Sequence, residues 1–116
     1  MNKFKDLLVW QKSIDLAEEV YRLTADFPGV EKFNLESQIK RSVVSIASNI
    51  AEGAGRGSKN EFKHFLSIAL GSSYELETQL ILSSRLNYGS KANIDLLLVK
   101  LDEIQKMLVG LHKSLV

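Results

Sequence analysis

The sequence predicts an all-α fold, an antiparallel up-down-up-down four-helix bundle. Three observations predict it: apolar residues recur every three or four positions along nearly the whole chain, the 116 residues include one proline, and the segments between the periodic stretches are short. Short connections between helices of about 30 Å make consecutive helices run in opposite directions. We therefore expect a single domain over residues 1–116, with helices at about residues 8–26, 35–53, 59–86 and 91–113.

The first two expected helices each carry more apolar surface than a bundle core requires. The first ends at about Asp26, before Pro28, because proline disfavours helical geometry in its predecessor and lacks a donor. The second begins after Asn34, a plausible N-cap, and ends at Gly53, which suits the left-handed closing position. Each helix has two apolar stripes: Trp10, Ile14, Ala17, Tyr21 and Leu16, Val20, Leu23, Phe27 in the first, and Ile39, Val43, Ile46, Ile50 and Val44, Ala47, Ala51 in the second.

The third and fourth expected helices begin at clear caps. Ser58 and Glu61 have the spacing of a capping box, and Ser90 follows a turn at residues 87–89. Their core seams are Phe62, Leu66, Ala69, Leu76, Leu80 in the third helix and Ile94, Leu97, Leu101, Ile104, Leu108, Leu111, Leu115 in the fourth. The fourth helix adds Leu96 and Leu98, so apolar surface is in excess. We expect self-association, the alternative being that these wide faces lie in the core.

A row of polar residues in the second helix is the most individual feature of the chain. The row consists of Gln38, Arg41, Ser45, Asn49 and Glu52, at steps of three or four that place them on one helix face. If that face points inward, each unpartnered group costs about 1 to 3 kcal/mol. The row therefore predicts a structural network in which Arg41 pairs with Glu52, or with Glu75 or Glu77 of the third helix. Ligand or phosphate binding is the alternative.

Composition excludes several classes of function. The chain has no cysteine, which removes thiol catalysis, cysteine zinc sites and disulfides. The beginning of the sequence does not resemble a signal peptide, and no segment approaches the roughly 20 apolar residues of a membrane span. We therefore expect a cytoplasmic protein without membrane association. The net charge of +1 is far from that of a dedicated nucleic-acid binder.

The charge is nevertheless uneven, because residues 40–63 hold five cations and two anions. The residues expected to contact nucleic acid are Lys40, Arg56, Lys59, Asn60 and Lys63. Free backbone donors and the helix dipole at the start of the third helix favour an anion. Binding there would be salt-dependent and largely indifferent to sequence. An ordinary solvated cationic loop is the alternative.

The candidate catalytic patterns are weak. Glu61 and His64 have the Glu-x-x-His spacing of di-iron bundles, but those sites need a second copy and the other histidine, His112, follows Val109 at that spacing. No serine, histidine and aspartate set has supporting spacing. We expect no catalytic residues, no metal and no cofactor, and hence a protein that is not an enzyme.

Several motifs carry a family resemblance, in order over residues 4–86. They are Phe4-x-x-Leu7-x-Val9-Trp10-Gln11-Lys12, Val20-Tyr21-x-Leu23-Thr24-x-x-Phe27-Pro28, Gln38-x-x-Arg41-Ser42, Ser45-Ile46-x-x-Asn49-Ile50-Ala51-Glu52-Gly53, Gly55-Arg56-x-Ser58 and Phe65-Leu66-x-Ile68-Ala69-x-Gly71-Ser72. The chain thereby resembles the four-helix bundle proteins encoded in 23S ribosomal RNA intervening sequences. The resemblance implies a ring-like homopentamer with a role in binding RNA or another nucleic acid.

Accessory proteins of diversity-generating retroelements are similar, with strongly basic surfaces that bind nucleic acid and a reverse transcriptase. A net charge of +1 departs from that pattern and makes a retroelement role less favoured. The expected function is a non-catalytic oligomeric bundle with weak, salt-dependent RNA binding. The alternative is a scaffold that docks another protein and binds no nucleic acid.

Overall fold

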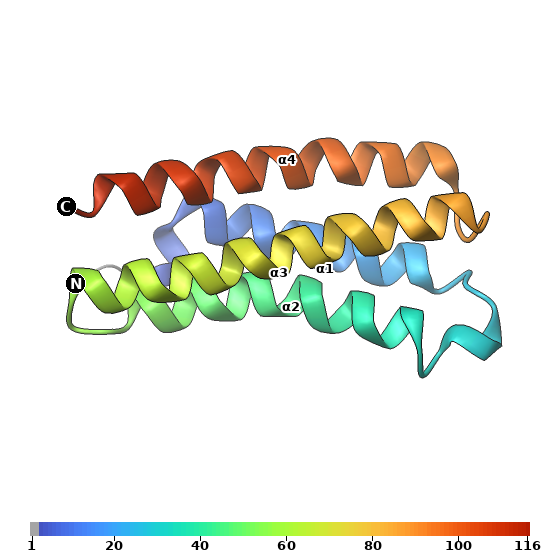
Figure 1. The fold of residues 1–116 in the computed structure, drawn as a ribbon, viewed down its shortest axis with the longest axis horizontal. Coiled ribbons are helices and arrows are strands. Elements are labelled where there is room, and N and C mark those ends of the chain that lie inside the picture. Colours follow the sequence, from blue (N-terminus) through green and yellow to red (C-terminus); the bar gives the residue numbers. More distant parts are fainter. Residues whose placement is uncertain (1–2) are drawn as a thin grey trace.

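The computed structural model describes residues 3–116 as four long helices with two short 3-10 turns. The elements are η1 (Phe4–Asp6), α1 (Leu8–Thr24), η2 (Gly29–Glu31), α2 (Leu35–Ala54), α3 (Lys59–Arg85) and α4 (Lys91–Ser114). The four helices lie alongside one another, and the connections between consecutive helices fall at alternate ends (Figure 1). Each helix begins and ends within two residues of the bounds expected from the sequence.

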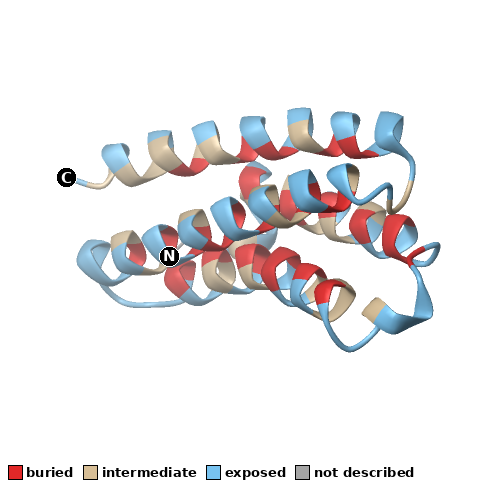
Figure 2. Ribbon diagram, turned by 45° about the vertical axis from the view of Figure 1, so that its right-hand side comes forward, coloured by how far each residue is buried: buried red, intermediate tan, exposed pale blue. Residues whose placement is uncertain are grey.

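The packing order of the helices follows the chain. α1 contacts α2 and α4, and α3 also contacts α2 and α4, so α1 and α3 lie diagonally across the bundle. The buried residues are on the sides of the helices that face the interior (Figure 2). The largest fully buried side chains come from all four helices: Leu16, Val20, Ile39, Ile46, Ile50, Leu66, Leu76, Leu80, Ile94, Leu101, Ile104 and Leu108. The all-α class and its four helices are confirmed.

Two of the three expected helix caps form. Ser58 Oγ accepts a hydrogen bond from the Glu61 amide at 3.1 Å, and Ser90 Oγ accepts one from the Asn93 amide at 3.3 Å. The expected cap at Asn34 is wrong, because its side chain points backward and donates to the Val30 carbonyl at 3.1 Å. The η2 turn brings Glu31 to this helix end instead, where its carboxylate accepts from the Leu35 amide at 3.4 Å.

Gly53 has a different role from the one expected. It is buried inside α2, and the helix continues to Ala54, so a left-handed closing position at Gly53 is wrong. A Cβ at this position would lie 2.8 Å from Phe65 Cβ and 3.0 Å from Phe62 Cδ1. Gly53 is therefore needed because α2 and α3 approach closely there, and the requirement is for space rather than backbone freedom.

The α1–α2 connection and the α3–α4 connection are joined by a side-chain contact. The Tyr88 hydroxyl donates to Glu31 Oε2 at 3.0 Å, and the Tyr88 ring lies 5.6 Å from that of Phe27. The hydrogen bond to Glu31, followed by burial and the nearby negative charge, raises the pKa of Tyr88 above its ordinary value. The turn itself uses left-handed backbone at Asn87 and Gly89, with φ of 59° and 71°.

Candidate nucleic-acid interface and polar seam

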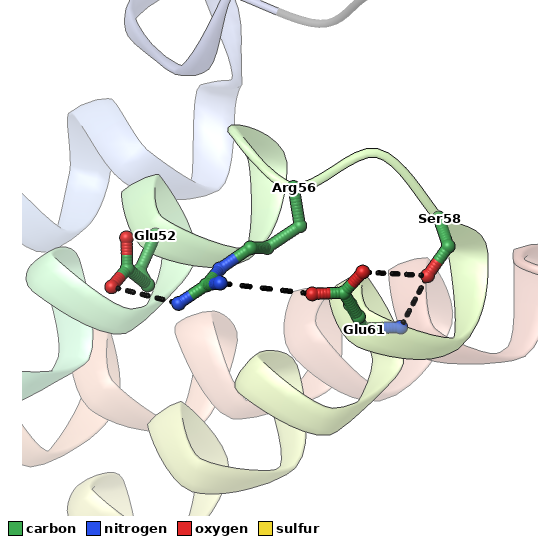
Figure 3. Close-up of polar contacts among 4 residues, drawn as sticks. All are labelled: Glu52, Arg56, Ser58 and Glu61. Carbon is green, nitrogen blue, oxygen red and sulfur yellow. Dashed lines mark hydrogen bonds and ion pairs between the residues drawn. The ribbon is translucent and has the colours of Figure 1, made fainter.

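The cationic residues at the start of α3 lie beside two carboxylates. Arg56 Nη2 is 3.3 Å from Glu52 Oε1, and Arg56 Nη1 is 3.7 Å from Glu61 Oε2 (Figure 3). The Arg56 guanidinium also lies over the Phe65 ring, 5.0 Å from its centroid. Arg56 thus lies between α2 and α3, and two carboxylates partly offset its positive charge. Exposed ion pairs of this kind contribute little to stability, about 0 to 1 kcal/mol each.

The capping box fixes the position of Glu61. Its amide donates to Ser58 Oγ, and the Ser58 hydroxyl in turn donates to Glu61 Oε1 at 3.2 Å (Figure 3). A carboxylate therefore already occupies part of the positive helix end, where an anion would otherwise be favoured. The remaining cationic surface comes from Lys59 and Lys63, with Asn60 between them in sequence. Within residues 3–116 neither lysine is paired with an aspartate or glutamate, but Lys59 Nζ donates to the Val116 backbone oxygen at 3.2 Å.

Lys40 lies apart from these residues. It precedes the end of α2 by fourteen residues, a separation of about 21 Å along the helix axis. Its Nζ is 2.8 Å from Glu36 Oε2 and 4.9 Å from the centroid of the Tyr21 ring. The structure therefore places Arg56, Lys59, Asn60 and Lys63 at one end of the molecule, around the start of α3, and leaves Lys40 near the opposite end.

Only two of the five residues in the polar row of α2 take part in the expected network. Ser45 Oγ lies 2.8 Å from Ser72 Oγ of α3, and Asn49 Nδ2 donates to Ser45 Oγ at 2.9 Å. These two side chains make a polar contact across the α2–α3 seam. The contact provides hydrogen-bond partners for short polar side chains where the two helices are close.

The remainder of the row is not inward. Gln38, Arg41 and Glu52 are exposed, and the expected pairing of Arg41 with Glu52 is wrong because Glu52 pairs with Arg56. Each residue of the row precedes a buried residue of α2 by one position and is therefore rotated from the core direction by about 100°. Short side chains at that angle reach the seam, whereas long ones extend into solvent.

Gln38 and Arg41 of the row border a polar groove between α2 and α3 of about 460 Å³. Its lining is entirely polar: Gln38, Arg41, Ser42 and Ser45 from α2, and Ser72, Glu75 and Gln79 from α3. Ser42 Oγ donates to Gln79 Oε1 at 2.7 Å. The sequence reasoning missed Gln79 in this groove, although its spacing of seven from Ser72 places both on one side of α3.

A second, apolar groove lies between α1 and α2. Trp10, Ile14, Ala17, Val44, Ala47 and Ala51 line a hollow of about 250 Å³. Val44 also borders a neighbouring hollow of about 570 Å³ that includes Tyr21 and Phe33. We call the two hollows together the α1–α2 groove. The second apolar stripes of the two helices thus meet at the surface, as their excess over the core requirement indicated.

The Glu61 and His64 side chains, which have the spacing of a metal motif, make other contacts in the structure. Residues 3–116 contain no group of three or more histidine, aspartate or glutamate residues placed to hold a metal ion. The Glu61 carboxylate is engaged by Ser58 and Arg56, and the His64 ring packs edge-on against Phe65 at 5.4 Å. Over the same described range, none of the helices combines the length and apolar character required to cross a membrane.

The fold and these surfaces define a small four-helix bundle protein with a polar α2–α3 seam, an apolar α1–α2 groove and a charged α2–α3 connection. A model of the 23S rRNA-intervening sequence protein family matches residues 5–110, and the chain belongs to this family. It is similar to a crystal structure from Bacteroides thetaiotaomicron, described as a protein with unknown function from the S23 ribosomal protein family. The TM-score is 0.82 at 29% identity, covering 91% of this chain and 99% of the other. A search of curated proteins found no similar sequence.

Proposed function

We propose that the protein is a non-catalytic, ring-like homo-oligomer of antiparallel four-helix bundles that binds RNA weakly. The RNA-binding surface, called here the α3 rim, consists of Arg56, Lys59, Asn60 and Lys63. The observation that carries this proposal is that two lysines without an aspartate or glutamate partner, within the described chain, lie within three residues of an asparagine at the start of α3. The family description, which refers to 23S rRNA, makes RNA the nucleic acid to test first.

Oligomerisation is part of the proposal because one copy of the rim is too weak by itself. Glu52 and Glu61 offset much of the charge of Arg56. Several copies on one ring would engage one RNA together, and linked weak contacts raise overall affinity by factors of about 10² to 10⁴. The α1–α2 groove supports self-association, because it leaves apolar surface of two helices uncovered.

The test is a titration of a structured ribosomal RNA fragment at low and moderate salt, with the oligomer monitored in parallel. The variant Lys59→Ala/Lys63→Ala should bind more weakly than the unchanged protein. The matched control Arg85→Ala/Lys91→Ala removes two cations at the α3–α4 turn, the other end of α3, and should retain binding. An intact oligomer that binds no RNA at low salt would contradict the proposal.

That contradicting result would favour the second candidate, a scaffold that docks another protein. The α1–α2 groove is the observation in its favour, since exposed apolar grooves mark protein interaction sites. In that case the α3 rim is an ordinary solvated loop, and neutralising its lysines leaves partner binding unchanged.

A further inference from the structure

The outer face of α3 is unusually poor in charge for a helix face turned away from the core. Ile68, Gly71, Tyr74, Thr78 and Ile81 succeed one another at steps of three or four and are exposed, as is Leu82 next to them. The exposed fractions of the four large side chains are 38% for Ile68, 51% for Tyr74, 41% for Ile81 and 45% for Leu82. We call these six residues the α3 face. It resembles the second apolar stripe of a helix that has a partner.

The α3 face and the α1–α2 groove are different surfaces on different sides of the molecule. α1 does not contact α3, because the two helices are diagonal in the bundle. A ring requires two different surfaces on each subunit, since each subunit must offer one patch to the preceding copy and another to the next. A two-fold dimer would instead need one patch that fits itself.

The charges beside the two surfaces are complementary. Lys32 and Arg41 border the Tyr21–Phe33 part of the α1–α2 groove, and within residues 3–116 neither forms an ion pair. Glu75 is exposed beside the α3 face and forms no ion pair in the described part of the chain, although it lines the polar α2–α3 groove together with Arg41 of the same chain. A copy that seats its α3 face in the groove would bring an anion to a cationic edge, which favours that pairing over groove against groove.

We propose that the subunit interface of the ring is heterologous, with the α3 face of one copy in the α1–α2 groove of the next. This inference rests on the proposed ring and adds the surfaces that build it. Apolar contact supplies most of the stabilisation, and the Glu75 carboxylate sets the orientation against Lys32 and Arg41. Each chain then uses both surfaces, and neither remains exposed in the closed ring.

Two single substitutions each disrupt one of the two surfaces and leave the other unchanged. Val44→Glu introduces a charge where the two hollows of the groove meet, and Ile81→Glu does the same on the α3 face. Both sites are exposed helix positions, and a cation lies four residues away in each case, Lys40 and Arg85 respectively. The matched control is Leu96→Glu on α4, where the side chain is 60% exposed and belongs to neither surface.

Sedimentation of each variant alone and of an equimolar mixture tests the inference. Val44→Glu and Ile81→Glu should each sediment as a 13.0 kDa chain, and Leu96→Glu should assemble as the unchanged protein does. The mixture should give a heterodimer of twice that mass, because the first variant keeps its α3 face and the second keeps its groove. Circular dichroism and melting check that each variant folds, and Tyr74→Glu replaces Ile81→Glu if the latter does not.

The possible failures are distinct. An unchanged protein that sediments as a monomer overturns the proposed ring and this interface with it. An unchanged protein that assembles, with either variant assembling normally, overturns the interface alone. Two monomeric variants whose mixture stays monomeric also overturn the heterologous pairing.

Discussion

Gly53 of α2 faces Phe65 of α3 so closely that a Cβ on the glycine would lie 2.8 Å from the phenylalanine Cβ. The two helices therefore meet at a distance that only glycine permits. Ser45 and Ser72 continue the same seam two turns away, with their hydroxyl oxygens 2.8 Å apart. Small residues on both helices determine how near α2 and α3 can pack, and this spacing sets the position of the α3 rim relative to Glu52.

Gly53→Ala should destabilise the fold, although alanine is the better helix former. The new methyl group must displace Phe65 or separate α2 from α3, and such overpacking costs about 1 to 3 kcal/mol. Urea unfolding followed by circular dichroism measures the change in the free energy of unfolding.

Gly110→Ala is the matched control for that substitution. Gly110 lies inside α4 with no heavy atom within 4 Å of where a Cβ would be. Alanine should therefore raise the free energy of unfolding by about 0.5 to 1 kcal/mol. If both substitutions stabilise the protein, the close approach at Gly53 is not real.

Much of this architecture could be predicted because its causes are local. The caps at Ser58 and Ser90 depend on a hydroxyl and an amide three residues apart, and both form. The core stripes depend on helical period, and the seam of α4 from Ile94 to Leu108 is buried throughout. Helical periodicity was therefore sufficient to predict the four helices and the apolar stripes that face the core.

The candidate site was harder to predict because it depends on distances between helices. The spacing of Arg41 and Glu52 placed them in one row without showing that the row lies at the edge of the core, where long side chains reach solvent. Likewise, the charge count for residues 40–63 combined Lys40 with Arg56, although α2 separates them by more than three turns. The Tyr88–Glu31 contact joins two connections that are 57 residues apart in sequence.

Ser72→Ala should cost about 0.5 to 1.5 kcal/mol in the free energy of unfolding, because it removes the hydrogen-bond partner of Ser45 across the seam. Ser67→Ala is the control, since Ser67 is exposed on α3, donates only to the Lys63 carbonyl of its own helix and should change stability by less than about 0.5 kcal/mol. Equal effects of the two substitutions in thermal or urea melts would show that the seam contact contributes nothing.

Stability should fall at alkaline pH partly through Tyr88. Its pKa is higher in the folded protein than the ordinary value of 10.0, because its hydroxyl donates to Glu31. The stabilisation is complete below the unfolded-state pKa and is lost as the pH rises through the higher folded-state pKa. Melting temperatures measured from pH 8 upward should decline less steeply for Tyr88→Phe than for the unchanged protein. Identical curves for Tyr88→Phe and the unchanged protein would contradict the contact.

Glu52→Gln should strengthen RNA binding by the α3 rim. The substitution removes one of the two carboxylates beside Arg56, leaving Glu61 at 3.7 Å as its remaining acidic neighbour. A guanidinium released from Glu52 can turn toward a phosphate, and one more phosphate contact steepens the dependence of log K on log salt by about 1. Titrations at several salt concentrations measure that slope. Glu103→Gln is the control, because it removes the same charge on α4, where the carboxylate pairs with Lys12 of α1. If the two variants bind RNA equally, the gain reflects net charge, and Arg56 is not a phosphate contact.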